Sequence, residues 1–246
     1  MTSSLVFALS LLVSSTWLAE NRDRVTVVHV GTPQSFAEEH VPGAHFLDVA
    51  KLVVPRTGNR DELPQIDQLQ ATLEELGIGT RGRIVIYGDE PQYAARLFWT
   101  LDYLGQGKRL ALLDGGLAQW KRDLRPVASG PPDHKRRPFT ARIELERLML
   151  MTKLQTLTNV PIVDARSAAE FEKGHIPNAV NVDWRSTVWR SDDELRKLFT
   201  VAPPAHVVVY DETGMEASWL YFVLRHLGYA PALFDGGWEE WGRWGG

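Results

Sequence analysis

The sequence contains no cysteine among its 246 residues, and this absence sets the first limits on its chemistry. Without cysteine the chain can form no disulfide, bind no metal through thiolates and carry out no thiol chemistry of its own. Positive charge is not in excess either, because 27 Lys and Arg stand against 31 Asp and Glu, which gives a formal net charge of −4. We therefore expect no nucleic-acid partner, since such a partner requires a basic face.

One apolar run near the N-terminus, Leu5–Val13, raises the question of membrane targeting. It is too short to span a bilayer as a helix, so we expect no membrane partner. Its length suits the apolar part of a signal peptide, but no Lys or Arg precedes Arg22 and no typical cleavage site follows. We predict a cytoplasmic protein, with export as the alternative if residues 1–19 act as a signal peptide.

What the sequence does contain is a globular composition, with 44% hydrophobic and 24% charged residues, and an internal repeat. HVPGAHFLD, which starts at His40, matches HIPNAVNVD, which starts at His175. IVIY in the first half matches VVVY in the second, and an Asp-Gly-Gly triplet follows each, at Asp114 and Asp235. The preserved order predicts a duplicated domain. Because the histidines recur in both halves, we expect them to be structural.

A stretch rich in proline, glycine and charge separates the halves, which predicts a first domain at 1–128, a linker at 129–138 and a second domain at 139–246. Hydrophobic patterning predicts strands at 25–30, 44–48, 84–87, 110–113, 160–163, 179–183, 207–210 and 232–234. It predicts helices at 33–39, 94–104, 168–173 and 217–227. This alternation indicates an α/β protein of two tandem domains, each a mostly parallel sheet flanked by helices.

In each half one apolar strand leads through a short loop into a helix, at residues 88–93 and 211–216. In open α/β sheets, ligands bind beyond the carboxyl ends of the strands, where helix N-termini point. A loop that curls from a strand into a helix turns its backbone N–H groups inward, and these donors form an anion-binding nest. We therefore look for the chemistry of the chain in these loops.

Three motifs give the sequence a specific resemblance: Asp164-Ala165-Arg166, the run HIPNAVNV at 175–182, and the terminal Asp-Gly-Gly-Trp with a second Trp at 235–241. From about residue 12 to the end, the chain resembles the two-domain rhodanese family of thiosulfate and 3-mercaptopyruvate sulfurtransferases. The resemblance implies two rhodanese-like domains, of which the first is inactive. It also implies a catalytic cysteine at the first position of the second domain's loop, directly after the strand at 207–210. The thiolate of this cysteine stores sulfur as a persulfide and passes it to cyanide or a thiol.

Asp211 occupies the position that the resemblance assigns to this cysteine, and Gly88 occupies the matching position in the first half. A carboxylate is a poor nucleophile toward sulfane sulfur and cannot hold a persulfide, which needs a thiolate of low pKa. Glu170 stands where family members active on mercaptopyruvate often carry an arginine. The resemblance therefore implies a family member with a changed site.

The remaining loop residues should form the nest, and they are Glu212, Thr213, Gly214, Met215 and Glu216. Two unit charges about 4 Å apart repel by roughly 4 kcal/mol at an effective dielectric constant near 20. The two glutamates, together with Asp211, should therefore disfavour a dianion such as thiosulfate.

We predict that Asp211 fills its own nest, with its carboxylate accepting the loop N–H groups and its pKa lowered as a result. Asp164 and Arg166 either brace the loop from below or orient a substrate anion. Arg185 either faces the cleft or lies on the solvated surface.

These observations predict a homologue of thiosulfate and 3-mercaptopyruvate sulfurtransferases with little or no activity. The alternative is a non-catalytic rhodanese-like module that binds a ligand or regulates a partner. A reaction that uses Asp211 as its nucleophile would normally need Mg²⁺ and further carboxylates or a lysine, and no such set is visible. We expect no cofactor and no metal, a small anionic ligand or a thiol acceptor as partner, and a monomer, because two linked domains already share an interface.

Overall fold

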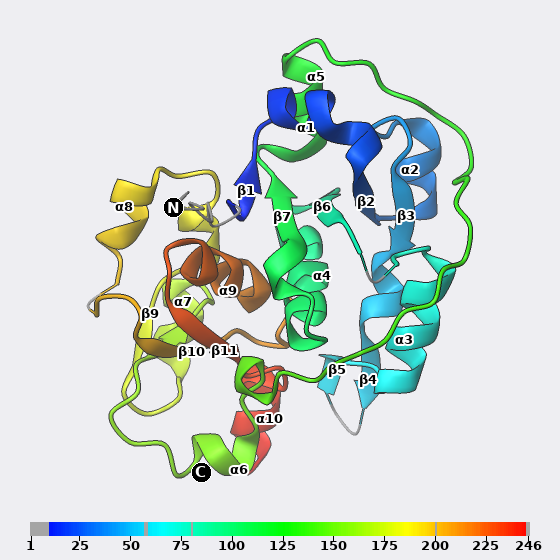
Figure 1. Ribbon diagram of the computed structural model, residues 1–246. Helices are drawn as coiled ribbons and strands as arrows, with labels where there is room; N and C mark the ends of the chain where they lie inside the picture. The colour runs from blue at the N-terminus through cyan, green and yellow to red at the C-terminus, as the bar shows by residue number, and fades with distance from the viewer. Residues whose placement is uncertain (1–9, 57–58, 80, 200, 245–246) are drawn as a thin grey trace, which may run out of the picture.

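The computed structural model describes residues 10–56, 59–79, 81–199 and 201–244, and it places them in two parallel sheets and one hairpin (Figure 1). The first sheet has the order β1 (Leu12–Val13), β7 (Leu110–Leu113), β6 (Arg83–Gly88), β2 (Val25–Gly31), β3 (His45–Asp48). The second has the order β11 (Ala230–Leu233), β10 (His206–Tyr210), β8 (Ile162–Asp164), β9 (Ala179–Asn181). Strands β4 (Val54–Arg56) and β5 (Asn59–Glu62) form the antiparallel hairpin.

The two sheets repeat one topology, because the order β7-β6-β2-β3 corresponds to β11-β10-β8-β9. All strand pairs within both sheets are parallel. The predicted α/β fold of two tandem domains is therefore confirmed. The first sheet has an additional edge strand, since Leu12 pairs with Leu112 and Val13 pairs with Leu113.

The helices begin where the local sequence supplies a cap or a proline. Helix α2 (Pro33–Glu38) has a proline in its first turn and follows Thr32, whose side chain accepts a hydrogen bond from the Ser35 N–H. Ser167 caps α7 (Ala168–Lys173) in the same way. The other helices are α1 (Ser15–Asn21), α3 (Ile66–Glu75), α4 (Pro91–Tyr103), α5 (Gly116–Arg122), α6 (Met151–Leu154), α8 (Asp192–Arg196), α9 (Ala217–His226) and α10 (Gly237–Trp244).

Helices α4 and α9 pack against each other between the sheets and form the centre of the molecule (Figure 1). Each follows the loop of its own domain, and the ring of Phe98 meets that of Phe222 edge-on, with the centroids 5.2 Å apart. Buried Asp102 on α4 accepts hydrogen bonds from the Tyr221 hydroxyl at 2.7 Å and from Arg225 Nε at 2.8 Å. The domains are therefore joined by both apolar packing and a buried polar network.

Residues 129–138 form no helix or strand and run along the outside of the first domain (Figure 1). The boundaries 1–128, 129–138 and 139–246 stay predictions.

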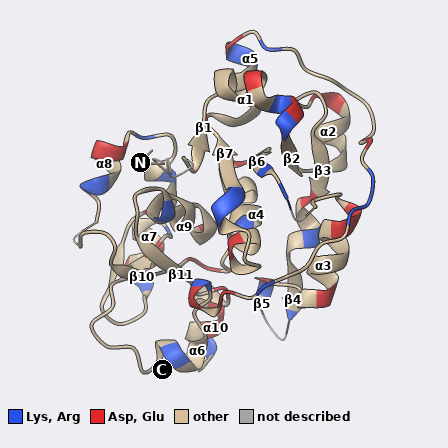
Figure 2. Cartoon of the chain, viewed as in Figure 1, with Lys and Arg blue, Asp and Glu red and all other residues tan. Residues whose placement is uncertain are grey.

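Basic and acidic segments are interspersed along the chain in the view of Figure 2, in keeping with 27 basic and 31 acidic residues. No helix among the described residues has both the length and the apolar character to cross a bilayer. Most of the predicted signal-peptide run, Leu5–Val13, lies outside the described residues.

Candidate functional site

The loop 211–216 of the second domain begins at the carboxyl end of β10, a strand that lies between β11 and β8. Asp211 is 1% exposed, and its carboxylate accepts hydrogen bonds from the backbone N–H groups of Gly214 at 2.5 Å and Glu216 at 2.9 Å. Gly214 has a φ of 89°, and a Cβ there would lie 2.6 Å from the Asp235 carbonyl oxygen. The loop thus curls around Asp211 as the sequence predicted, and the turn requires glycine.

The predicted pKa of Asp211 is wrong in direction. Complete burial raises the pKa of this carboxyl to about 7, and the nearby charge of Glu216 adds to the rise. The N–H groups of Glu216, Gly214 and Ala217 favour the charged form but do not outweigh the loss of hydration. For this carboxyl, the N–H donors of the nest therefore offset only part of the cost of burying the charge.

Two glutamates flank this nest, and each forms an ion pair with an arginine. The Glu212 carboxylate lies 3.4 Å from Arg166 Nη1, and the Glu216 carboxylate lies 2.9 Å from Arg185 Nη2. These arginines offset part of the negative charge expected around the nest, but Arg166 also pairs with Asp164 and Arg185 also pairs with Asp183. Thr213 is buried and Met215 is half-buried in the same loop.

Arg166 is a buried brace beneath the loop. Its guanidinium donates to both carboxylate oxygens of Asp164, with Nη2 at 2.7 Å from Oδ2, and Nη2 also donates to the Gly174 carbonyl oxygen at 2.7 Å. It is 3% exposed, and Asp164 is fully buried. These contacts favour the bracing role over substrate orientation for both residues.

Replacing Arg166 with lysine should lower the free energy of unfolding by about 1.5–3 kcal/mol, because a lysine cannot reproduce the planar, two-pronged pairing with Asp164. Urea unfolding followed by circular dichroism measures the loss. Arg185→Lys is the control, since Arg185 is 56% exposed and its pair with Glu216 should contribute less than about 1 kcal/mol. Equal losses for the two variants would contradict the bracing role of Arg166.

Glu170 is engaged at the start of α7. Its carboxylate accepts hydrogen bonds from the Ser167 N–H at 3.0 Å and the Ser167 hydroxyl at 2.5 Å, which closes the cap of α7. The two repeated histidines have matching surroundings: His40 stacks on Phe36 and His175 stacks on Phe171, each at 3.9 Å between ring centroids. The predicted structural role of the histidines is therefore supported in both domains.

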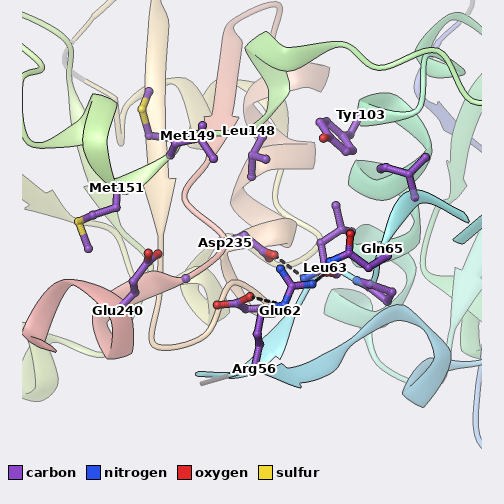
Figure 3. A pocket seen from close by; sticks show the side chains of 14 residues that line it. Arg56, Glu62, Leu63, Gln65, Tyr103, Leu148, Met149, Met151, Asp235 and Glu240 are labelled. Carbon is purple, nitrogen blue, oxygen red and sulfur yellow. Dashed lines mark hydrogen bonds and ion pairs between the residues drawn. The ribbon is translucent and has the colours of Figure 1, made fainter. Parts of the chain in front are cut away.

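Sequence reasoning missed Arg96, which reaches the site from the first domain. It is fully buried on α4, and its guanidinium Nη1 lies 2.5 Å from Asp235 Oδ1 and 3.3 Å from the Gly214 carbonyl oxygen. Asp235 also accepts the Leu63 N–H at 2.7 Å, beside a cavity of about 280 Å³ that lies between the domains (Figure 3). The available signal was a single arginine within the apolar run of residues 94–101.

Gly237, the second glycine of the Asp-Gly-Gly triplet, allows its own backbone to lie close to the loop 211–216. Gly237 has a φ of 58°, and a Cβ there would lie 2.5 Å from the Glu212 carbonyl oxygen and 2.6 Å from that of Asp211. The Trp238 N–H donates to the Asp211 carbonyl oxygen at 2.8 Å. Among the described residues, no three His, Asp or Glu side chains are grouped as a metal site would require.

Comparison with known proteins places this geometry in context. The sequence model of the rhodanese-like domain matches residues 14–123 and again residues 146–243. The 3-mercaptopyruvate sulfurtransferase of Escherichia coli K12 is 28% identical over 265 residues, which cover 94% of each chain. The thiosulfate sulfurtransferase of Azotobacter vinelandii is 30% identical over 239 residues, covering 88% of this chain and 87% of the relative. The crystal structure of the 3-mercaptopyruvate sulfotransferase SseA from Escherichia coli superposes with a TM-score of 0.84 at 26% identity, covering 93% of this chain and 99% of that one.

Proposed function

The chain belongs to the rhodanese family, and from this premise we propose that it is a sulfurtransferase homologue whose second-domain site no longer transfers sulfur. The observation that carries the proposal is the fully buried carboxylate of Asp211, which takes up the N–H groups of Gly214 and Glu216. These donors are the ones that a sulfur-bearing anion in the loop would need. A carboxylate supplies neither the thiolate nucleophile nor the persulfide on which sulfur transfer depends.

The experiment is a thiocyanate-formation assay with thiosulfate and cyanide on the native chain and on Asp211→Cys. We expect the native chain to stay at the uncatalysed rate. The introduced thiol should raise the rate by at least about tenfold, equivalent to about 1.4 kcal/mol of barrier, because the loop donors that now hold Asp211 become free to hold the persulfide.

Asp211→Ser is the matched control, because serine has the shape of cysteine but cannot carry sulfur, and it should remain at the uncatalysed rate. Adding Glu216→Gln to Asp211→Cys should raise the rate further, since it frees Arg185 from its ion pair at the loop. Turnover by the native chain at the rate of an active sulfurtransferase would overturn the proposal.

A second function, that of a non-catalytic binding module, is favoured by a different observation. A cavity of about 460 Å³ lies at the equivalent loop of the first domain, where Gly88 occupies the position that corresponds to Asp211. Binding of a ligand in this cavity would require neither Asp211 nor sulfur transfer.

A further inference from the structure

The cavity at the first domain's loop lies between the two domains. Gly88, Asp89 and Pro91 contribute to its wall from the loop that follows β6, and Trp189 and Trp219 contribute from the second domain. Its volume of about 460 Å³ lies within the range of about 300–1,000 Å³ typical of small-molecule sites. The loop 88–93 is the counterpart of 211–216, and the cavity lies beside it, because a Cβ at Gly88 itself would meet the backbone oxygens of Val30 and Glu90 at 2.9 Å.

Asp89 is fixed within this cavity by three hydrogen bonds. Its Oδ1 lies 2.6 Å from Nε2 of His29, and its Oδ2 accepts the Thr32 N–H at 2.9 Å and the Ser35 hydroxyl at 2.5 Å. His29 is 1% exposed, whereas the Asp89 side chain is 23% exposed. A carboxylate has about four lone-pair sites, so three partners leave acceptor capacity for a ligand.

The carboxylate of Asp89 is also favoured in its charged form. Burial would raise its pKa, but the hydrogen bonds from His29, Ser35 and Thr32 outweigh burial and lower the pKa below its ordinary value. Among the described residues that line the cavity, Asp89 is the only one with a charged side chain. The cavity therefore presents one carboxylate, paired with buried His29, on walls that are otherwise apolar or neutral.

The repeat shows how this differs from the second domain. Glu212, the counterpart of Asp89, is paired with Arg166, and the position of Arg166 is taken in the first repeat by Gly31. A Cβ at Gly31 would clash with the Asp89 carboxylate, so the glycine makes room for that group. In the second repeat Arg166 pairs with both Asp164 and Glu212. In the first repeat Asp89 pairs with His29, the counterpart of Asp164, and no arginine among the described residues pairs with it.

Trp189 gives the cavity an aromatic wall that is held in a strained conformation. Its φ of 55° lies in the left-handed region, which costs a residue other than glycine roughly 1–3 kcal/mol. Trp189 is 44% exposed, and its ring meets that of Trp219 at 5.1 Å between centroids and an angle of 75°. Trp219 Nε1 donates to the Thr187 hydroxyl at 3.0 Å. Aromatic faces attract cations as well as other rings.

We propose that this cavity binds a small organic cation, an aryl-alkyl amine whose ammonium group pairs with Asp89 and whose ring packs against Trp189. The Asp89 carboxylate supplies the ion pair, and the described residues that line the cavity include no arginine or lysine that could pair with an anion. The apolar walls accommodate the ring of the ligand.

The test is isothermal titration calorimetry of the full chain with 2-phenylethylamine, and with 2-phenylethanol and phenylacetate as neutral and anionic probes of similar shape. We expect the amine to bind at least about tenfold more tightly than the alcohol, equivalent to about 1.4 kcal/mol, and phenylacetate to bind most weakly. Asp89→Asn should remove the preference for the amine, and Trp189→Ala should weaken both the amine and the alcohol.

Asp114→Asn is the matched control, because Asp114 is an exposed carboxylate that lines the adjoining cavity rather than this one, and it should leave amine binding unchanged. Equal affinity for amine and alcohol, absence of amine binding at millimolar concentration, or an amine preference retained in Asp89→Asn would each overturn the proposal. Should Asp89→Asn fail to fold, the comparison of the three probes on the native chain and on Trp189→Ala decides the question.

Discussion

Replacing Arg96 with methionine should lower the free energy of unfolding by about 3–5 kcal/mol, the loss expected when one partner of a buried ion pair is removed. The substitution leaves the buried Asp235 carboxylate without its cation. It also removes the donors to the Gly214 carbonyl oxygen and, at 2.9 Å, to the Asp61 carbonyl oxygen. Methionine retains much of the apolar stem, so the loss reports the charge and hydrogen bonds rather than a cavity.

Chemical unfolding followed by both tryptophan fluorescence and circular dichroism measures this loss. Arg60→Met is the matched control, because Arg60 also bridges the domains, through Glu239 at 2.6 Å, but is 67% exposed. That pair should contribute no more than about 1 kcal/mol. In the double variant Arg96→Met/Asp235→Asn, part of the loss should be recovered, since the uncompensated charge is gone. A loss below about 1 kcal/mol for Arg96→Met would show that the buried pair does not hold the domains together.

The internal repeat was enough to predict the fold, because strand and helix patterns in each half reflect contacts within that half. The strands at 25–30 and 110–113 are β2 and β7 with near-identical bounds. Strand β1 was not foreseen, since an apolar stretch near a chain end has the same composition whether it pairs with a sheet edge or is part of a signal peptide. Only the partner strand, Leu110–Leu113, distinguishes the two cases.

The place of Asp211 in the fold was predictable from the sequence, but its electrostatic surroundings were not. Asp211 was located because it follows a recognisable strand, and its hydrogen bonds to Gly214 and Glu216 follow from loop geometry. The ion pairs Arg166–Glu212 and Arg185–Glu216 join residues far apart in the chain, so neither has a local signature. The depth at which the Asp211 carboxyl is buried is likewise a tertiary property, and it reversed the expected direction of its pKa shift.

That reversal makes the pH dependence of stability the sharpest test of the Asp211 environment. The carboxyl of Asp211 ionises near pKa 3.8 in an ordinary setting and near about 7 in the folded chain. Between these values the folded protein holds a proton that the unfolded chain has lost, so the stability contributed by Asp211 is complete below pH 3.8 and falls as the pH rises through 7. At about 1.4 kcal/mol for each pKa unit, the full loss is about 4 kcal/mol.

Asp211→Asn removes this titration because the amide stays neutral. Relative to the native chain, the variant should therefore gain about 4 kcal/mol of unfolding free energy between pH 4 and pH 8, measured by urea unfolding at a series of pH values. Asp23→Asn is the control, since the Asp23 side chain is 93% exposed and water solvates its charge in both states. A difference that instead turns against Asp211→Asn as the pH rises would mean that the loop N–H groups stabilise the ionised carboxylate more than burial penalises it. The nest would then be a genuine anion site, and the loss of sulfur transfer would rest on the missing thiol alone.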